Sequence, residues 1–248
     1  MRYFVVCSYD GTNFVGWQHQ VEGRSIQDEI EKVLSKVLNE PIKIYASGRT
    51  DAGVHAFGQT FHFDVSKEIQ DVAKMLYAFN RLLPPDITFN ELSDVEDDFH
   101  ARFSATSKAY LYVVSTSGHD VFNRNYRYEL KQYLNVDAMR EAADLFVGVH
   151  NFQNFTSKEE DENNFEREIY KFQFGALNEC ILIKVWGNGF MRYMVRMIVG
   201  TLIEVGLGKL TVNDVKGLLE KTPRSIVSYK APAHGLYLES VQYEGRLL

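Results

Sequence analysis

The order of strand-like and helix-like segments is the feature that most constrains the fold of this chain. β-branched and aromatic runs predict strands, and apolar residues at helical spacing predict amphipathic helices. In the first part the predicted elements are a strand at 3–9, a helix at 25–38, strands at 42–46 and 59–65, a helix at 72–83 and a strand at 87–92. Pro41 and Pro84 follow the two helices and prevent their continuation. The order β-α-β-β-α-β is typical of a ferredoxin-like unit.

The second part of the chain repeats this order less regularly. Its predicted elements are a strand at 110–114, a helix at 135–146, strands at 169–174 and 180–186, helices at 190–205 and 211–220, and a strand at 236–243. Two successive passes predict an α+β fold of two ferredoxin-like halves, with a boundary near residues 95–107. The expected domains are residues 1–100 and 101–248. A site built from both halves would lie in the cleft between them.

The distribution of charge is compatible with a nucleic-acid ligand. The net formal charge is −6, but residues 86–98 carry −6 and residues 159–168 carry −5, so the rest of the chain carries +5. Two acidic stretches on a mildly basic body permit a local basic cleft. No apolar run approaches the roughly 20 residues that span a membrane, and the first residues do not resemble a secretory signal. We therefore expect a cytoplasmic protein with no membrane segment.

The sequence gives no sign of a metal or a nucleotide cofactor. Cys7 and Cys180 lie in apolar strand-like runs and are expected to be buried, reduced thiols. The seven histidines have no zinc-type spacing. There is no phosphate-binding GxxxxGK[ST] loop, and Arg192 stands where a dinucleotide fingerprint after Gly187 would need glycine.

The most unusual segment is Gly48–Ala56, which reads GRTDAGVHA and joins two predicted strands. Its glycines let the backbone adopt unusual conformations and let another chain approach closely. Arg49 and Thr50 supply donors that could orient a carboxylate or a phosphate. Asp51 is therefore the leading catalytic candidate. The alternative is that aspartate and glycine only form a turn here.

A second feature is the pair Arg192 and Arg196 in the very apolar helical segment 191–200. One of the two must lie near buried surface, and a buried guanidinium without a carboxylate partner is costly. An ionised aspartate could satisfy Arg196, and the cation would in turn favour the charged carboxylate. The alternative is an arginine whose stem lies along the core while its head stays in water.

A third feature is the alternation of Lys108, Tyr110 and Tyr112 on a predicted strand. Side chains at every second position share one face of a strand, so a basic and two aromatic groups point together. Such a face suits stacking on a nucleobase beside a phosphate. The alternative is that the aromatic rings only pack in the core.

Together these residues resemble the tRNA pseudouridine synthase A (TruA) family. GRTDAGVHA is similar to the active-site signature of that family, and further segments agree with it in order and spacing across nearly the whole chain. These segments are Tyr9-Asp10-Gly11, Gly16-Trp17-Gln18, Ser25-Ile26-Gln27, residues 98–105, Phe190, Met194-Val195-Arg196, residues 198–200, Ala231-Pro232 and residues 235–238. A collinear set of this length is far more specific than one short motif.

The resemblance implies an enzyme that converts uridine to pseudouridine at positions 38 to 40 in the anticodon arm of tRNA. It implies two ferredoxin-like halves that share an extended antiparallel or mixed sheet with a central cleft, a homodimer, and no cofactor. By position, Asp51 would be the catalytic aspartate, and Tyr110 would stack on the target base and assist proton removal from C5. Arg196 would pair with Asp51, and Arg49 would hold the RNA backbone or the flipped nucleotide. Further backbone contacts are expected from a set of basic residues, Arg24, Arg102, Lys108 and Arg192.

Two departures from the family pattern keep other readings open. Met197 follows Arg196 where many members carry asparagine, and the acidic residues 159–168 occupy a loop where relatives often present an arginine pair, leaving only Arg167. An acidic loop would repel RNA. A related synthase acting on another RNA, such as ribosomal RNA, therefore remains an alternative. So does a non-catalytic RNA-binding module, whereas a glycosidase would need a second acid that the Asp51 loop lacks.

Overall fold

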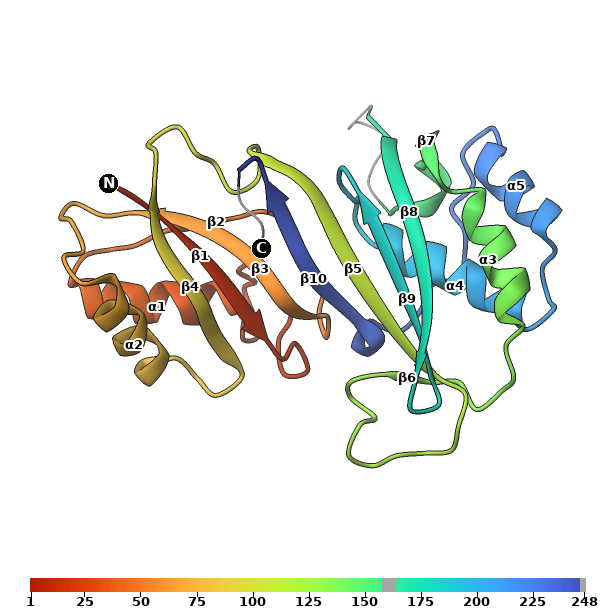
Figure 1. The fold of residues 1–248 in the computed structure, drawn as a ribbon, viewed down its shortest axis with the longest axis horizontal. Helices are drawn as coiled ribbons and strands as arrows, with labels where there is room; N and C mark the ends of the chain where they lie inside the picture. Colours follow the sequence, from red (N-terminus) through yellow and green to blue (C-terminus); the bar gives the residue numbers. More distant parts are fainter. Residues whose placement is uncertain (158–163, 246–248) are drawn as a thin grey trace. The chain divides into compact units, whose positions relative to one another are not determined.

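The computed structural model describes residues 1–157 and 164–245. By their internal contacts the residues form two compact units, Met1–Thr106 with Tyr237–Leu248, and Ser107–Leu236. Figure 1 shows that each unit combines a sheet with helices packed on it. No helix within the described residues is long and apolar enough to cross a membrane.

The sheet of the first unit is built around the buried strand β1 (Arg2–Tyr9). It pairs antiparallel with β4 (Ile87–Val95) on one side and with β3 (His55–Asp64) on the other. The short β2 (Ile44–Ala46) adds antiparallel to β3, and β10 (Leu236–Tyr243) pairs with β3 in parallel. The beginning of β10, at Tyr237 and Leu238, therefore lies directly beside the beginning of β3, at His55 and Ala56.

Two helices, α1 (Ile26–Leu38) and α2 (Val72–Leu82), cover this sheet. Ser25 caps α1 by accepting a hydrogen bond from the Asp28 backbone N–H, and Asp71 caps α2 in the same way. The apolar faces of the helices and the sheet close over a core rich in phenylalanine, which includes Phe61, Phe63, Phe79 and Phe89. This packed core gives the loops at the ends of β1 and β3 a rigid base.

The second unit has a sheet in the order β5 (Ala105–Ser115), β9 (Cys180–Gly187), β8 (Glu166–Leu177) and β7 (Gly148–Asn151). All three pairings are antiparallel, and the two-residue β6 (Tyr128–Glu129) adds in parallel to β5. The helices are α3 (Val136–Asp144), α4 (Met194–Gly206) and α5 (Val212–Glu220), with short 3-10 turns at Gln153–Phe155 and Ala233–Gly235. Helix α4 is buried on nearly all sides, as its apolar sequence requires.

The α+β class is confirmed, and most predicted elements are present. The predicted helix at 190–205 is wrong at its start, because Tyr193 adopts a left-handed conformation and α4 begins at Met194. Strand β3 begins at His55, four residues earlier than predicted, and β6 and β7 had no clear signal. Cys7 and Cys180 are buried and free, as predicted, and burial raises the pKa of the Cys7 thiol. The domains 1–100 and 101–248, and the cleft between the halves, stay predictions.

Candidate active site

The loop that carries Asp51 runs from the end of β2 to the start of β3 and is fixed at its beginning by Gln59. The side chain of Gln59 accepts a hydrogen bond from the Ser47 hydroxyl at 2.8 Å and donates one to the Gly48 carbonyl at 2.9 Å. Gln59 is fully buried on β3. Gln59 therefore fixes the direction in which the loop leaves the sheet, although Gln59 lies outside the GRTDAGVHA motif.

The segment after β1 fixes the loop at Asp51 itself. The hydroxyls of Tyr9 and Thr50 lie 2.8 Å apart in a buried contact, and the Trp17 N–H donates to the Thr50 carbonyl at 3.1 Å. Gly16 forms an isolated antiparallel bridge with Asp51. Its φ is +116°, and a Cβ there would lie 2.9 Å from the Thr50 carbonyl oxygen. Only glycine lets the two segments approach this closely.

The far end of the loop is held by His55 and Gly11. Gly11 is buried, and a Cβ on it would lie 2.1 Å from the Val54 carbonyl oxygen. Its N–H donates to Nδ1 of His55 at 3.1 Å, and Oδ1 of Asp10 lies 3.2 Å from the same nitrogen. The His55 ring is buried and stacks on Tyr237 with 4.8 Å between ring centroids.

Sequence reasoning missed the positioning roles of Tyr9, Gly16 and His55. The segments that contain them were recognised only as parts of a family pattern, and nothing in the sequence showed that they contact the Asp51 loop. A signal was present in the two glycines of the 9–17 segment, because paired glycines in a loop often mark close approach to another backbone.

Asp51 and Arg49 differ in exposure, although they lie in the same loop. Asp51 is half-buried, Thr50 is buried, and Arg49 is exposed. No hydrogen bond or ion pair of the Arg49 side chain is found among residues 1–157 and 164–245. The loop thus presents a partly desolvated carboxylate next to a guanidinium that can contact a ligand.

In the second unit, β5 places Tyr110 and Tyr112 in different environments. Tyr110 is half-buried, with the edge of its ring against Phe190 at 5.2 Å between centroids. Tyr112 is fully buried, its hydroxyl donates to the Pro232 carbonyl at 2.9 Å, and burial raises its pKa. The prediction that both tyrosines could form a stacking face is therefore wrong for Tyr112, which belongs to the core.

Arg196 lies in the first turn of α4 and is half-buried. Its Nε donates to the Ala231 carbonyl at 2.8 Å, and the Ala231 N–H donates to the Arg196 carbonyl at 2.9 Å. The guanidinium lies over the Tyr193 ring, 5.3 Å from its centroid. The arginine is thus oriented by its own unit, and its predicted pairing with Asp51 stays a prediction.

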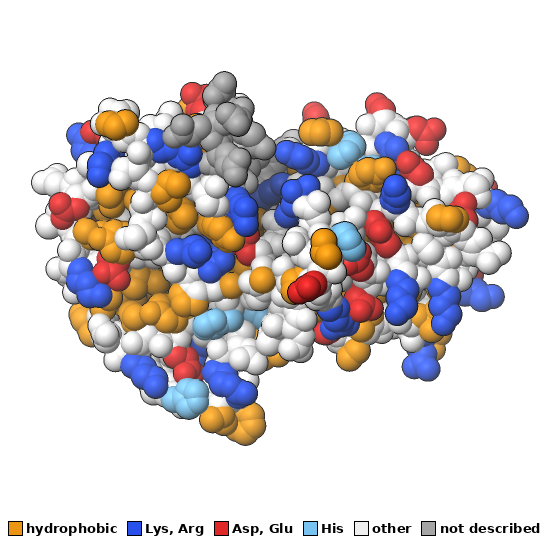
Figure 2. Space-filling view, turned by 180° about the vertical axis from the view of Figure 1, so that it is seen from behind, with side chains coloured by type: hydrophobic (Ala, Val, Ile, Leu, Met, Phe, Trp, Pro, Cys, Tyr) orange, Lys and Arg blue, Asp and Glu red, His pale blue; other side chains and the backbone are white. Residues whose placement is uncertain are grey.

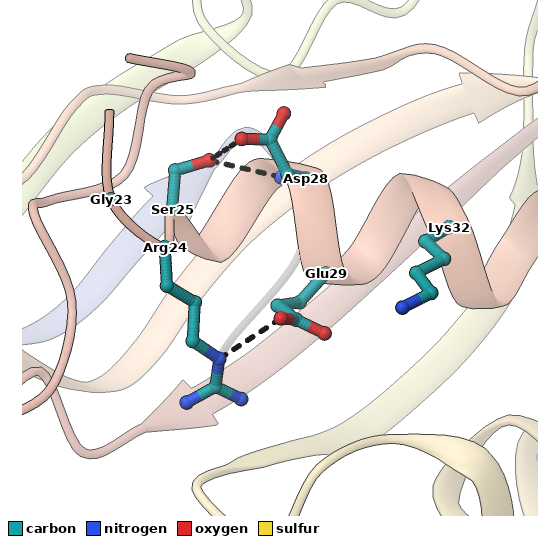
Figure 3. A pocket seen from close by; sticks show the side chains of 6 residues that line it. All are labelled: Gly23, Arg24, Ser25, Asp28, Glu29 and Lys32. Carbon is teal, nitrogen blue, oxygen red and sulfur yellow. Dashed lines mark hydrogen bonds and ion pairs between the residues drawn. The ribbon is translucent and has the colours of Figure 1, made fainter. Parts of the chain in front are cut away.

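The four basic residues that are predicted to contact the RNA backbone have different surroundings. Arg24 forms ion pairs with Glu29 at 2.9 Å and Asp86 at 2.6 Å and lies over the Phe14 ring, so two carboxylates already balance its charge. The hydrogen bond to Asp86 is the main cause that raises the pKa of Arg24. Figure 3 shows Arg24 directed toward Glu29 on the first turns of α1. Arg102 and Arg192 are exposed, whereas Lys108 is half-buried, as Arg24 is.

Two further predictions concern metal sites and the acidic stretch. Over the described residues no group of three or more His, Cys, Asp or Glu side chains could hold a metal ion. Of the acidic residues 159–168, positions 159–163 lie outside the described residues. Arg167 lies in β8 between Glu166 and Glu168.

Comparison with known proteins identifies the family of the chain. The family model described as tRNA pseudouridine synthase matches residues 5–104 and 142–244, which include both the Asp51 loop and α4. The chain is 42% identical over 247 residues to tRNA pseudouridine synthase A of Bacillus subtilis (strain 168), covering 98% of this chain and 100% of that one. It is 42% identical over 243 residues to the protein of the same name from Thermosipho melanesiensis (strain DSM 12029 / CIP 104789 / BI429), covering 98% and 99%.

A solved structure described as "Crystal Structure of a Cbf5-Nop10-Gar1 Complex" covers 81% of this chain and 54% of its own, with a TM-score of 0.36 and 13% identity. That similarity is too low to support an argument about fold. The family match and the full-length relatives are sufficient by themselves. The chain belongs to the tRNA pseudouridine synthase family.

Proposed function

We propose that this protein is an isomerase that converts uridine to pseudouridine in tRNA, at positions 38 to 40 of the anticodon arm. The observation that carries the proposal is the Asp51 loop, in which contacts from two other segments fix the backbone around a half-buried aspartate beside an exposed arginine. The relatives named tRNA pseudouridine synthase A support tRNA as the substrate.

The reaction needs few groups, because no atoms other than hydrogen enter or leave. The bond from C1′ of the ribose to N1 of uracil breaks, the base turns, and a bond forms from C1′ to C5. C5 then loses its proton to solvent and N1 gains one, so no oxidant or energy source is consumed. A carboxylate at the position of Asp51 can act on the sugar or the base while the glycosidic bond breaks.

The other site residues have supporting roles in this proposal. The target base lies in a stacked arm, so it has to be flipped out, and Tyr110 offers an aromatic surface for it. Arg49 holds the backbone or the flipped nucleotide, and Arg196 pairs with Asp51 to keep the carboxylate ionised. Arg102, Lys108 and Arg192 position the RNA through its phosphates, and Arg24 does so only if it leaves its carboxylate partners. The protein acts in the cytoplasm as a homodimer, without a cofactor.

The test is the release of tritium from tRNA transcripts labelled at uridine C5. Formation of the bond from C1′ to C5 must expel that hydrogen, so the assay reports the reaction itself. We expect release by the purified protein without ATP or added metal, and mapping of the product should place pseudouridine at positions 38 to 40. Release only from ribosomal RNA would contradict tRNA as the substrate. No release from any RNA by folded protein that still binds tRNA would favour a binding module.

Replacement of Tyr110 separates stacking from proton transfer. We expect Tyr110→Phe to bind tRNA normally and to slow turnover by about 10²-fold, the lower range for loss of an acid–base group. Tyr110→Ala should also weaken binding, because stacking is worth about 1–3 kcal/mol per base. Turnover and tRNA affinity are measured for both variants.

Tyr112→Phe is the matched control on the same strand. It removes the hydrogen bond to Pro232 but leaves the core packed, so we expect a small loss of stability and unchanged turnover. If Tyr110→Phe and Tyr110→Ala both turned over like the wild type, Tyr110 would have no part in the mechanism.

A further inference from the structure

Three cations converge on the ring of Tyr193 at the start of α4. The Lys230 Nζ lies 4.4 Å from the ring centroid, and the guanidinium carbons of Arg192 and Arg196 lie at 4.9 Å and 5.3 Å. An Arg192 Nη2 also donates to the Tyr193 hydroxyl at 3.2 Å. We call Arg192, Tyr193 and Lys230 the Tyr193 cluster. Its members come from two segments of the second unit that are more than thirty residues apart in the sequence.

The backbone holds the two segments of the cluster together. Residues 229–231 cross α4 at Gly200, where a Cβ would lie 2.8 Å from the carbonyl carbon of Tyr229 and 2.9 Å from the Lys230 nitrogen. The reciprocal hydrogen bonds between Arg196 and Ala231 fix the same crossing. Tyr193 itself has φ 62° and ψ 0°, which turns the chain just before the first helical residue. The position of Lys230 relative to Tyr193 is therefore fixed by the packing of residues 229–231 against α4.

Within the described residues, the two exposed cations of this cluster have no acidic partner. Arg192 and Lys230 are both exposed, and within the described parts of the chain neither forms an ion pair with a carboxylate. The charged groups of Arg192 and Lys230 lie 4.9 Å and 4.4 Å from the same ring centroid, so they are separated by no more than about one Debye length, which is roughly 8–10 Å at moderate salt. The aromatic ring attracts each cation but carries no net charge. An anion bound here would relieve the repulsion among the cations.

The negative net charge of the chain makes a local group of cations important for attracting a polyanion. On the face shown in Figure 2, basic and acidic side chains are interspersed over much of the surface. The net charge of the whole chain is −6. Attraction of a polyanion therefore depends on places where cations are concentrated.

We propose that the Tyr193 cluster binds a backbone phosphate of the RNA substrate. This inference rests on the proposed function and deepens it. Three cations already lie over the ring, so the ring is not available for stacking on a base and instead holds the cations in position. The two exposed side chains can contact a phosphate that passes over the surface, as a polynucleotide backbone does. Arg196 links the cluster to the proposed catalytic residues.

The salt dependence of RNA binding tests this assignment. The affinity for a tRNA transcript is measured in the Asp51→Asn background, so that the RNA is not modified, at NaCl concentrations from 50 to 200 mM. Each lost phosphate contact reduces the slope of log Kd against log salt by about 0.7–0.9. We expect Lys230→Met to show this reduction, so that the fourfold rise in salt weakens its binding about threefold less than that of the parent. Arg192→Met should behave alike, and Lys230→Arg should retain the parental slope.

The matched control is Lys209→Met, which removes an equally exposed lysine of the same unit that pairs with Glu204. Its slope should not change. A parental slope in folded Lys230→Met and Arg192→Met would overturn the proposal, as would an equal reduction in Lys209→Met. Turnover by the protein with intact Asp51 is measured separately on labelled tRNA. If the protein turned over tRNA but Lys230→Met left the salt slope of binding unchanged, only the role of the cluster would be refuted. If Lys230→Met reduced the slope but the protein showed no turnover, only the proposed function would be refuted.

Discussion

Replacement of Asp51 by asparagine is expected to lower pseudouridine formation by roughly 10⁴-fold or more while leaving the fold intact. Asparagine has nearly the same shape, so the bridge with Gly16 and the contacts around Thr50 remain. It has no negative charge and cannot act as a nucleophile or a base at neutral pH. Tritium release from tRNA labelled at uridine C5 measures the loss, and a binding assay on the same transcript should give an affinity close to that of the wild type.

The control for this substitution is Asp137→Asn, which replaces an exposed aspartate of the second unit that pairs with Arg140 on the surface. Because surface ion pairs contribute little, we expect unchanged turnover and stability. Turnover by Asp51→Asn within tenfold of the wild type would exclude Asp51 as the catalytic carboxylate. A parallel loss of turnover, affinity and thermal stability would instead indicate damage to the loop.

Segments with one dominant local signal were predictable from the sequence. Strand β1 contains the aromatic and β-branched run Tyr3–Val6, and α1 has both an apolar stripe and the capping residue Ser25. In each case local propensity and the burial pattern favour the same structure. Strand β7 was missed because its four residues alternate between half-buried and exposed and show no apolar run.

The start of α4 was mispredicted for a physical reason. Residues 190–193 continue the apolar pattern of the helix, and nothing in the sequence indicates that Tyr193 adopts positive φ. An aromatic residue in that conformation is unfavourable by about 1–2 kcal/mol, so tertiary contacts must hold it. The cations around its ring are part of those contacts, and their assembly depends on residues 229–231.

The reactive residues of the candidate site were easier to predict than the residues that hold them in place. Asp51 and Arg49 could be identified because their residue types and the glycines around them are unusual in a connection. Tyr112 was misjudged because alternation identifies residues on one face of a strand but not the depth at which each one lies. Tyr9, Gly11 and Gly16 are distant in sequence from the Asp51 loop that they contact, and those contacts arise only when β1 and β3 pair.

The close contact between Gly11 and the Asp51 loop leads to the second prediction with a large effect. We expect Gly11→Ala to lower turnover by about 10²-fold or more and to destabilise the first unit by about 1–3 kcal/mol. A Cβ at this position would lie 2.1 Å from the Val54 carbonyl oxygen, so either the 9–17 segment or the Asp51 loop must move. Movement would also weaken the hydrogen bond from Gly11 to His55. Tritium release and thermal unfolding measure the two effects.

The same substitution at Gly217 should have the opposite effect on stability. Gly217 is exposed within α5, and a Cβ there would meet no atom within 4 Å. Alanine is favoured over glycine in a helix by about 0.5–1 kcal/mol, which raises Tm by roughly 2–4 °C per kcal/mol in a chain of this size. Turnover should be unchanged, because α5 carries no proposed site residue. If Gly11→Ala retained wild-type turnover and Tm, the contact between the 9–17 segment and the Asp51 loop would not position the catalytic carboxylate. If its turnover fell while its Tm matched that of the wild type, the contact would serve positioning alone, since the added methyl group would have displaced the loop without weakening the core beneath it.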